Sequence, residues 1–170
     1  MNKNDLRFQK TELLIKNTYF ALKKRGSTMV KVKDLCDIAM INKTTFYAHY
    51  ETIEHLHQAV CEDFVIGILS KTLNIEKIQS EIRTFVYSIL NAFVEEMSTV
   101  EKLYGDDMHA LVNDIETILM ERFLPDTVDE DYELSIRFCI GGAFRLLARE
   151  KNPLRIQKTV ELIERVLNSQ

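Results

Sequence analysis

The stretch from Lys31 to Tyr50 constrains the fold of this chain more than any other. Its first half predicts a short helix, because apolar side chains recur there at helical spacing, at Val32, Leu35, Ile38 and Ala39. The pattern then breaks, and Asn42 is suited to the N-cap of a second helix because its side-chain oxygen can accept a backbone N–H. The stretch therefore predicts two short helices joined by a tight turn.

The second of these helices is expected to begin near Lys43, with Phe46 on its inward face. Its outward face then carries a lysine, two hydroxyl side chains and an alanine, namely Lys43, Thr44, Tyr47 and Ala48. Lysine neutralises phosphate, a hydroxyl can hydrogen-bond a base edge or a phosphate, and a small side chain lets a helix sit deep in the major groove. Such a face is suited to duplex DNA.

Three segments carry the pattern: DLC at residues 34–36, AMIN at residues 39–42 and TFYAHY at residues 45–50. Together they resemble the helix-turn-helix signature of the TetR/AcrR family of transcriptional regulators, over roughly the first third of the chain. The resemblance implies an all-α fold of about nine helices. It also implies a helix-turn-helix DNA-binding domain at residues 1–52 and a helical effector-binding and dimerisation domain at residues 53–170.

The function that the resemblance implies is a ligand-responsive repressor that binds a two-fold operator as a homodimer. The expected DNA-binding residues are Lys31, Lys33, Asn42, Lys43, Thr44, Thr45, Tyr47 and His49. Each has a plainer alternative as a solvated surface residue. Asn42 and Thr45 can also cap or pack, and His49 can pack at the end of the helix.

The charge is unevenly placed along the chain, although the formal net charge is only -4. Residues 1–60 carry ten Lys/Arg and six Asp/Glu, a net of +4, and residues 61–170 carry twelve and twenty, a net of -8. A basic N-terminal part on an acidic body fits phosphate binding through one face.

Neither a metal site nor a disulfide framework is expected. Cys36, Cys61 and Cys139 are far apart, odd in number and free of any C-x-x-C pair, which favours a reducing cytoplasm. His55 and His57 are two residues apart and would lie on different sides of a helix. No cofactor is expected. The chain also starts without the apolar run of a signal peptide, and no stretch reads as a membrane span, so we expect a soluble cytoplasmic protein.

The rest of the chain reads as amphipathic helices. The expected ranges are 7–24, 52–70, 76–97, 108–123, 129–149 and 154–167, with a short helix and turn in 98–107. The first range has Phe8, Leu13, Leu14 and Phe20 among its inward residues. Gly26 is its expected C-terminal stop, and Thr52 is the expected cap of the range that follows the helix-turn-helix. The last two long segments form a predicted helical hairpin.

An effector pocket is expected among the middle helices. Its candidate lining is Phe85, Tyr87, Phe93, Tyr104, Met108 and Met120, and the alternative is that these side chains are simply core. The hairpin is expected to dimerise through Ile136, Ile140, Phe144, Leu147, Ile163 and Val166, with the intrachain core as the alternative use of these residues. Gly141-Gly142 in mid-helix indicates close approach of another backbone.

Three positions depart from the family pattern. Lys31 stands where a Ser or Thr is usual, Met40 where a glycine is usual, and Ile53 where a lysine is usual. They keep a second hypothesis open, a helical interaction protein or a partner-dependent co-regulator that has lost autonomous DNA binding. No phosphate loop, nucleophile elbow or paired-carboxylate arrangement stands out, so we do not expect an enzyme.

Overall fold

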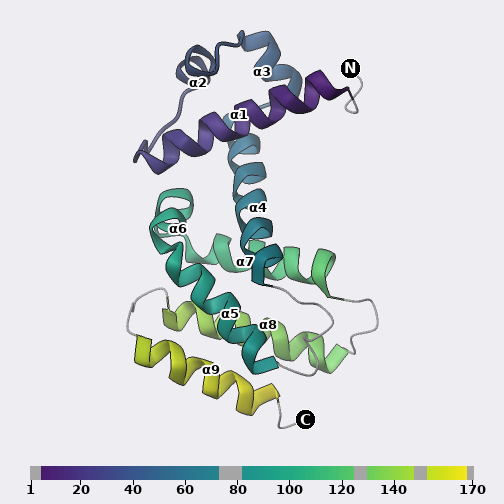
Figure 1. Ribbon diagram of the computed structural model, residues 1–170, viewed down its shortest axis with the longest axis vertical. Coiled ribbons are helices and arrows are strands. Elements are labelled where there is room, and N and C mark those ends of the chain that lie inside the picture. Colours follow the sequence, from purple (N-terminus) through teal and green to yellow (C-terminus); the bar gives the residue numbers. More distant parts are fainter. Residues whose placement is uncertain (1–4, 73–81, 125–129, 148–152, 168–170) are drawn as a thin grey trace. The chain divides into compact units, whose positions relative to one another are not determined.

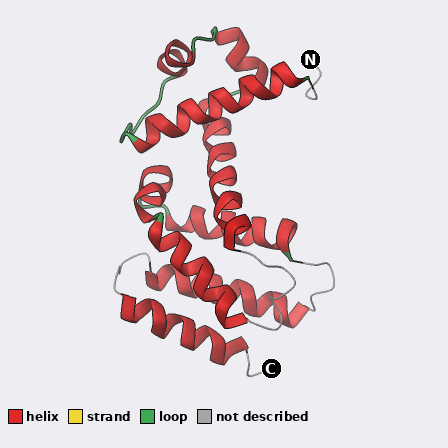
Figure 2. Cartoon of the chain, viewed as in Figure 1, coloured by secondary structure: helices red, strands yellow, loops and turns green. Residues whose placement is uncertain are grey.

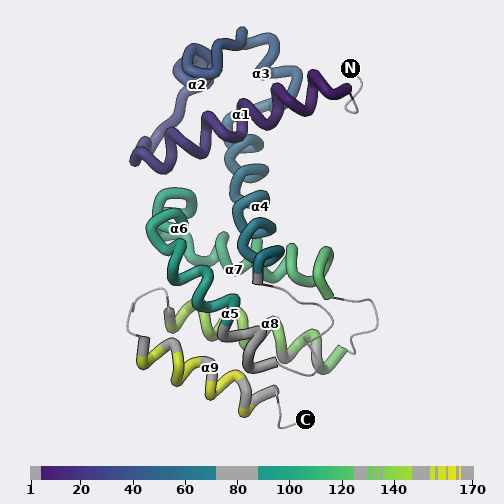
Figure 3. Tube along the Cα trace, viewed as in Figure 1, coloured from purple at the N-terminus to yellow at the C-terminus, as the bar shows by residue number. Residues whose placement is uncertain are grey.

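The computed structural model describes residues 5–72, 82–124, 130–147 and 153–167, and the remaining residues are drawn in grey (Figure 3). Within the described ranges every regular element is a helix, which confirms the prediction of an all-α fold (Figure 2). The chain divides into two compact units, Met1–Asp63 and Phe64–Gln170, which we call the N-terminal and C-terminal units. The division lies eleven residues beyond the expected boundary between residues 52 and 53.

The N-terminal unit contains α1 (Leu6–Lys24), α2 (Val32–Ala39), α3 (Lys43–His49) and the first part of α4 (Ile53–Thr72), labelled in Figure 1. Asp5 caps the first helix, because its carboxylate accepts the Arg7 N–H at 2.9 Å. After α1 ends at Lys24, Gly26 takes a φ of 92°, a left-handed value that suits glycine. The predicted glycine stop is therefore confirmed.

The buried face of α1 differs from the predicted one. Phe8, Ile15 and Tyr19 point into the core, whereas Leu13 is 59% exposed and Leu14 is exposed as well. The spacing of seven and then four residues places the three buried side chains on one stripe of the helix. In the apolar run at residues 13–15 only the third residue falls on that stripe, so the prediction that Leu13 and Leu14 face inward is wrong.

The start of α4 packs against α1, which explains why it belongs to the N-terminal unit. Lys16 Nζ lies 2.7 Å from Asp63 Oδ2, and the rings of Tyr19 and His57 have centroids 5.9 Å apart. Burial, with the negative charge of nearby groups, raises the pKa of Tyr19 to about 12. Thr52 caps α4 as predicted, because its hydroxyl oxygen accepts the His55 N–H at 3.1 Å.

The C-terminal unit continues from the end of α4 through α5 (Ile82–Glu95), α6 (Met97–Tyr104), α7 (Met108–Ile118), a π-helical turn (Leu119–Phe123), α8 (Glu130–Leu147) and α9 (Pro153–Leu167). Helix α8 packs against both α7 and α9, and α5 also packs against α9. The helices predicted at 98–107, 129–149 and 154–167 are thus present. The helix predicted over 108–123 is α7 followed by the π-helical turn.

The core of the C-terminal unit joins helices that are distant in sequence. Phe93 of α5 meets Phe144 of α8 edge to face, with ring centroids 5.1 Å apart. The Tyr104 hydroxyl donates to Asp114 Oδ2 at 2.8 Å and so links α6 to α7. All three cysteines are buried free thiols. In the described ranges, no helix is both long and apolar enough to cross a membrane.

Candidate nucleic-acid interface

Helix α2 presents one buried face to the N-terminal unit. Leu35, Cys36 and Ala39 are buried, as their spacing requires, and α2 packs against both α1 and α3. Burial, aided by the charge of Asp37, raises the pKa of the Cys36 thiol. Ile38 is 54% exposed, so the prediction that it belongs to the buried face is wrong. The helix is therefore held by a narrower stripe than the sequence indicated.

The turn after α2 is built on a left-handed residue. Met40 takes φ 53° and ψ 40°, and the Ile41 N–H then donates back to the Cys36 carbonyl at 3.0 Å. This conformation is normally a glycine's, so the methionine carries backbone strain. Its side chain is 94% exposed and is not held by packing. The turn is tight, as predicted, and it directs the chain straight into α3.

Asn42 sets the start of α3. Its Oδ1 accepts the Thr45 N–H at 2.7 Å and the Thr45 hydroxyl at 2.9 Å. The predicted N-cap is therefore confirmed. The Asn42 side-chain oxygen accepts two hydrogen bonds from Thr45. The side chains of Asn42 and Thr45 therefore stabilise the start of α3 in the free protein.

The exposed face of α3 carries the row that the sequence indicated. Phe46 is fully buried, whereas Lys43, Thr44 and Ala48 are exposed and Tyr47 is 55% exposed. The ring of Phe46 meets the Tyr47 ring edge to face at 5.3 Å, which supports one side of the exposed ring. A cation, two hydroxyls and a small side chain thus share one accessible surface.

The end of α3 is fixed to α1 by aromatic contacts. His49 stacks on Phe8 with ring centroids 3.8 Å apart, and its buried Nδ1 has no hydrogen-bond partner among the described residues. Burial lowers the pKa of His49, with the charge of Glu12 acting in the opposite direction. The Tyr50 hydroxyl donates to Glu12 Oε1 at 3.3 Å, and burial with this carboxylate raises the Tyr50 pKa. His49 therefore positions α3.

Two further lysines of the expected set lie at the start of α2. Lys31 occupies the N-cap position of α2 and Lys33 lies in its first turn, and both are exposed. Helix α1 also ends in a cationic turn, where Lys24 Nζ lies 5.4 Å from the centroid of the Phe20 ring. Exposed cations at these places can neutralise phosphates.

Compared with protein-family models, with curated proteins and with solved structures, the chain finds no match. The account of the site therefore rests on its own geometry and chemistry. Within the described ranges, no group of three or more His, Cys, Asp or Glu side chains is placed to hold a metal ion.

Four of the six residues expected to line an effector pocket have described side chains, and they lie at different places in the C-terminal unit. Phe93 and Tyr104 are buried in the core, which was the alternative use. Met120 is half-buried, and Met108 lines a groove between α7 and α8. The side chains of Phe85 and Tyr87 lie outside the described residues.

Of the six residues expected at the dimer interface, the four with described side chains lie inward. Ile136, Phe144 and Ile163 are buried and Ile140 is half-buried within a single chain, so the intrachain core is where the structure places them. The side chains of Leu147 and Val166 lie outside the described residues. The predicted hairpin of α8 and α9 is present, and the described residues of the expected interface lie on the side that packs within the chain, which was the alternative use of these residues.

The sequence analysis missed a set of exposed apolar side chains on α8 and α9. These are Leu134, Phe138, Leu146, Leu154 and Leu162, each more than half exposed. They include all the exposed large apolar side chains that the structure describes in the C-terminal unit. The signal was present, because a second apolar stripe at helical spacing accompanies the buried one on each helix.

Proposed function

We propose that this chain is a DNA-binding transcriptional regulator of the TetR/AcrR type that acts as a homodimer. The observation that carries the proposal is the exposed row of Lys43, Thr44 and Tyr47 on α3, a short helix capped at one end and stacked on α1 at the other. A rigid, exposed helix with cationic and hydroxyl side chains has the chemistry needed to enter a major groove.

Within this proposal the side chains have distinct roles. Thr44 and Tyr47 read base edges, where losing a good contact costs about 1–3 kcal/mol at one base pair. Lys43, Lys33 and Lys31 neutralise phosphates, and these contacts weaken binding to all sequences alike when they are lost. The role is one of binding, and we assign no catalytic residue.

A second copy of the chain would supply the second half-site reader. The exposed apolar face of α8 and α9, defined by Leu134, Phe138, Leu146, Leu154 and Leu162, is the surface we assign to that contact. Large apolar patches on a soluble protein mark interaction surfaces, and a two-fold interface uses the same patch on both copies.

The proposed regulation is a small effector that binds the C-terminal unit and changes DNA affinity. Such an effector acts only through different affinities for the DNA-competent conformation and for the alternative one. Helix α4 belongs to both units along the chain, since it begins at Ile53 and ends at Thr72 across the division at Asp63.

Fluorescence anisotropy tests the proposal, with labelled duplexes from the flanks of the protein's own gene and random duplexes as competitors, over a salt series. The wild type should prefer one duplex, with a steep salt slope. Tyr47→Ala should lose that preference. Lys43→Ala should weaken binding to all duplexes and reduce the steepness of log affinity against log salt concentration by about one. Lys158→Ala removes an equal charge from an exposed position on α9 and should change neither the preference nor the salt dependence.

A second candidate function is a partner-dependent co-regulator whose N-terminal unit binds a protein. It is favoured by three exposed apolar side chains close to α2 and its turn, Met29, Ile38 and Met40. In the same experiment this candidate predicts weak binding that is equal for all duplexes and unaffected by Tyr47→Ala.

A further inference from the structure

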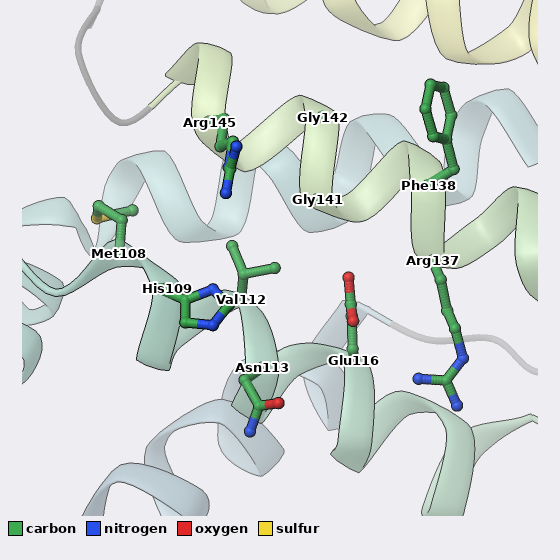
Figure 4. A pocket seen from close by; sticks show the side chains of 10 residues that line it. All are labelled: Met108, His109, Val112, Asn113, Glu116, Arg137, Phe138, Gly141, Gly142 and Arg145. Atoms are coloured by element: carbon green, nitrogen blue, oxygen red, sulfur yellow. The ribbon is translucent and has the colours of Figure 1, made fainter.

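A groove lies between α7 and α8 in the C-terminal unit (Figure 4). Its volume is about 440 Å³, within the range of small-molecule sites. One wall comes from a single face of α7, where His109, Val112, Asn113 and Glu116 follow one another at helical spacing. The opposite wall comes from α8.

The charges in the groove are of both signs and are free to bind. Among the described residues, neither Glu116 of α7 nor Arg145 of α8 has an ion-pair partner within 4.0 Å. Arg137 lines the same groove, but it is engaged by Glu133 of its own helix, with Nη2 and Oε1 2.8 Å apart. The groove therefore offers one unpaired carboxylate and one unpaired guanidinium.

The floor of the groove is bare backbone. A Cβ added at Gly141 would meet Glu116 Oε1 at 3.6 Å, and one added at Gly142 would meet no atom of the described residues within 4 Å. Among the described residues, no backbone atom outside α8 lies within 4 Å of a Cβ built at either glycine, so the close approach expected from the sequence is not found there. The space above the glycines is open, and the carboxylate of Glu116 reaches into it (Figure 4).

An apolar side chain lies between the two charges. Val112 projects from the α7 wall between Arg145 and Glu116 (Figure 4), whereas Phe138 of α8 lies at the other end of the groove and is 73% exposed. Gly141 and Arg145 are four residues apart, so their backbones differ by about 6 Å along the helix. An arginine side chain at this spacing can reach a ligand that also touches the Glu116 carboxylate.

We propose that the groove binds a small zwitterion of the amino-acid class, with a carboxylate and a protonated amine on an apolar body. Arg145 pairs with the carboxylate in two-pronged geometry, the Glu116 carboxylate accepts from the amine, and Val112 contacts the apolar body. This ligand would be the effector of the proposed regulator, and its effect on DNA affinity rests on the proposed function. Ligand binding itself is independent of the DNA-binding proposal.

Three probes with one apolar body test the charge assignment: L-phenylalanine, 3-phenylpropionate and 2-phenylethylamine. Each is titrated into the full chain labelled with ¹⁵N, and the amide signals of the five glycines are followed. The signals of Gly141 and Gly142 should shift saturably as L-phenylalanine is added, and the two single-charge probes should bind more weakly. Those of Gly26, Gly67 and Gly105, outside the groove, are internal controls. Equal response to all three probes, or none at millimolar probe, would overturn the proposal.

Two variants separate the two charges. Arg145→Gln should weaken the binding of L-phenylalanine and 3-phenylpropionate about tenfold and leave the affinity for 2-phenylethylamine unchanged. Glu116→Gln should instead weaken the binding of L-phenylalanine and 2-phenylethylamine. Arg165→Gln and Glu121→Gln, at exposed positions outside the groove, are the matched controls.

The competing occupant of the groove is a second copy of the chain, and light scattering after gel filtration distinguishes it. If Arg145→Gln or Glu116→Gln dissociates an oligomer while probe affinity stays unchanged, the groove is an interface and the proposal fails. A chain that binds L-phenylalanine with the predicted variant pattern but binds no DNA would support the groove and refute the proposed regulator. The two failures are therefore distinguishable.

Discussion

At the scale of single residues, the pose of α3 depends on a few side chains that do not face outward. Asn42 closes the start of the helix through two hydrogen bonds, Phe46 is fully buried beneath it, and His49 stacks on Phe8 at its end. These contacts fix the direction in which Lys43 and Tyr47 project. The residues that would read DNA therefore owe their geometry to neighbours that never touch it.

The turn before α3 contains strain that a single substitution relieves. Met40→Gly should raise the free energy of unfolding by about 1 kcal/mol, because glycine adopts the left-handed φ of 53° without a steric penalty. The exposed methionine side chain loses no packing in the exchange. Urea unfolding followed by circular dichroism measures the difference. Met40→Ala keeps the strain and should leave stability unchanged, and a destabilised glycine variant would contradict the strained turn.

The half-buried His49 makes stability depend on pH. Burial lowers the pKa of His49 below its ordinary value of 6.5, so the unfolded chain takes up a proton more readily than the folded chain. The free energy of unfolding should therefore be highest above about pH 6.5 and should decrease as the pH falls below this value.

Urea unfolding at steps from about pH 8 to about pH 5 checks this dependence. His49→Phe keeps a ring to stack on Phe8 and should flatten the fall in stability on the acid side. His55→Phe, at an exposed position, is the matched control and should keep the wild-type slope. A His49→Phe profile parallel to the wild type would show that another group carries the acid sensitivity.

At the scale of helices, the sequence predicted where elements begin and end better than which face is buried. Asn42, Thr52 and Gly26 have local capping chemistry, and the structure uses each as predicted. Leu13 and Ile38 were assigned inward and are exposed, because a helix with more apolar residues than one stripe can bury must leave some outside. Which stripe packs is decided by partner helices, which periodicity does not name.

The same ambiguity applies to the hairpin. Helices α8 and α9 each carry two apolar stripes, and the sequence could not show that Ile136 and Ile163 face the chain's own core while Phe138 and Leu162 face outward. The groove between α7 and α8 was missed for a related reason. Its charged residues, Glu116 and Arg145, are distant in sequence and line one groove only because the two helices pack together.

The glycine pair of α8 yields a prediction at this scale. Gly142→Ala should raise the free energy of unfolding by roughly 0.5–1 kcal/mol, because alanine favours the helix and its Cβ meets no described atom within 4 Å. Thermal or urea unfolding measures the change. Gly105→Ala, where φ is 59°, is the contrasting control and should destabilise the chain. A loss of stability in Gly142→Ala would indicate that another backbone does pack there.

At the scale of the whole molecule, the account assigns separate tasks to two compact units. The basic N-terminal unit presents the α3 surface, and the acidic C-terminal unit has exposed apolar side chains on α8 and α9 together with a charged groove. Each unit would fail alone in the proposed role, since a two-fold operator requires two readers held together.

Dimerisation through the exposed face is directly testable. Leu162→Glu should shift the protein from dimer to monomer in light scattering after gel filtration, because it places a charge in the apolar contact. The monomer's own stability should change by no more than about 0.5 kcal/mol, since the side chain is exposed in one chain. Leu13→Glu, equally exposed on α1, should leave the dimer intact. A monomeric wild type at micromolar concentration would contradict the assignment.

The central claim is that α3 reads duplex DNA as one half of a two-fold pair, and selection from a random pool of duplexes tests it most directly. Purified protein is used to enrich bound duplexes, and the enriched pool is sequenced for the wild type and for Tyr47→Ala. We predict an inverted repeat with the wild type, its half-sites spaced by whole turns of about 10–10.5 base pairs, and its loss or relaxation with the variant. No enrichment, or the same enriched sequence from both proteins, would contradict the claim.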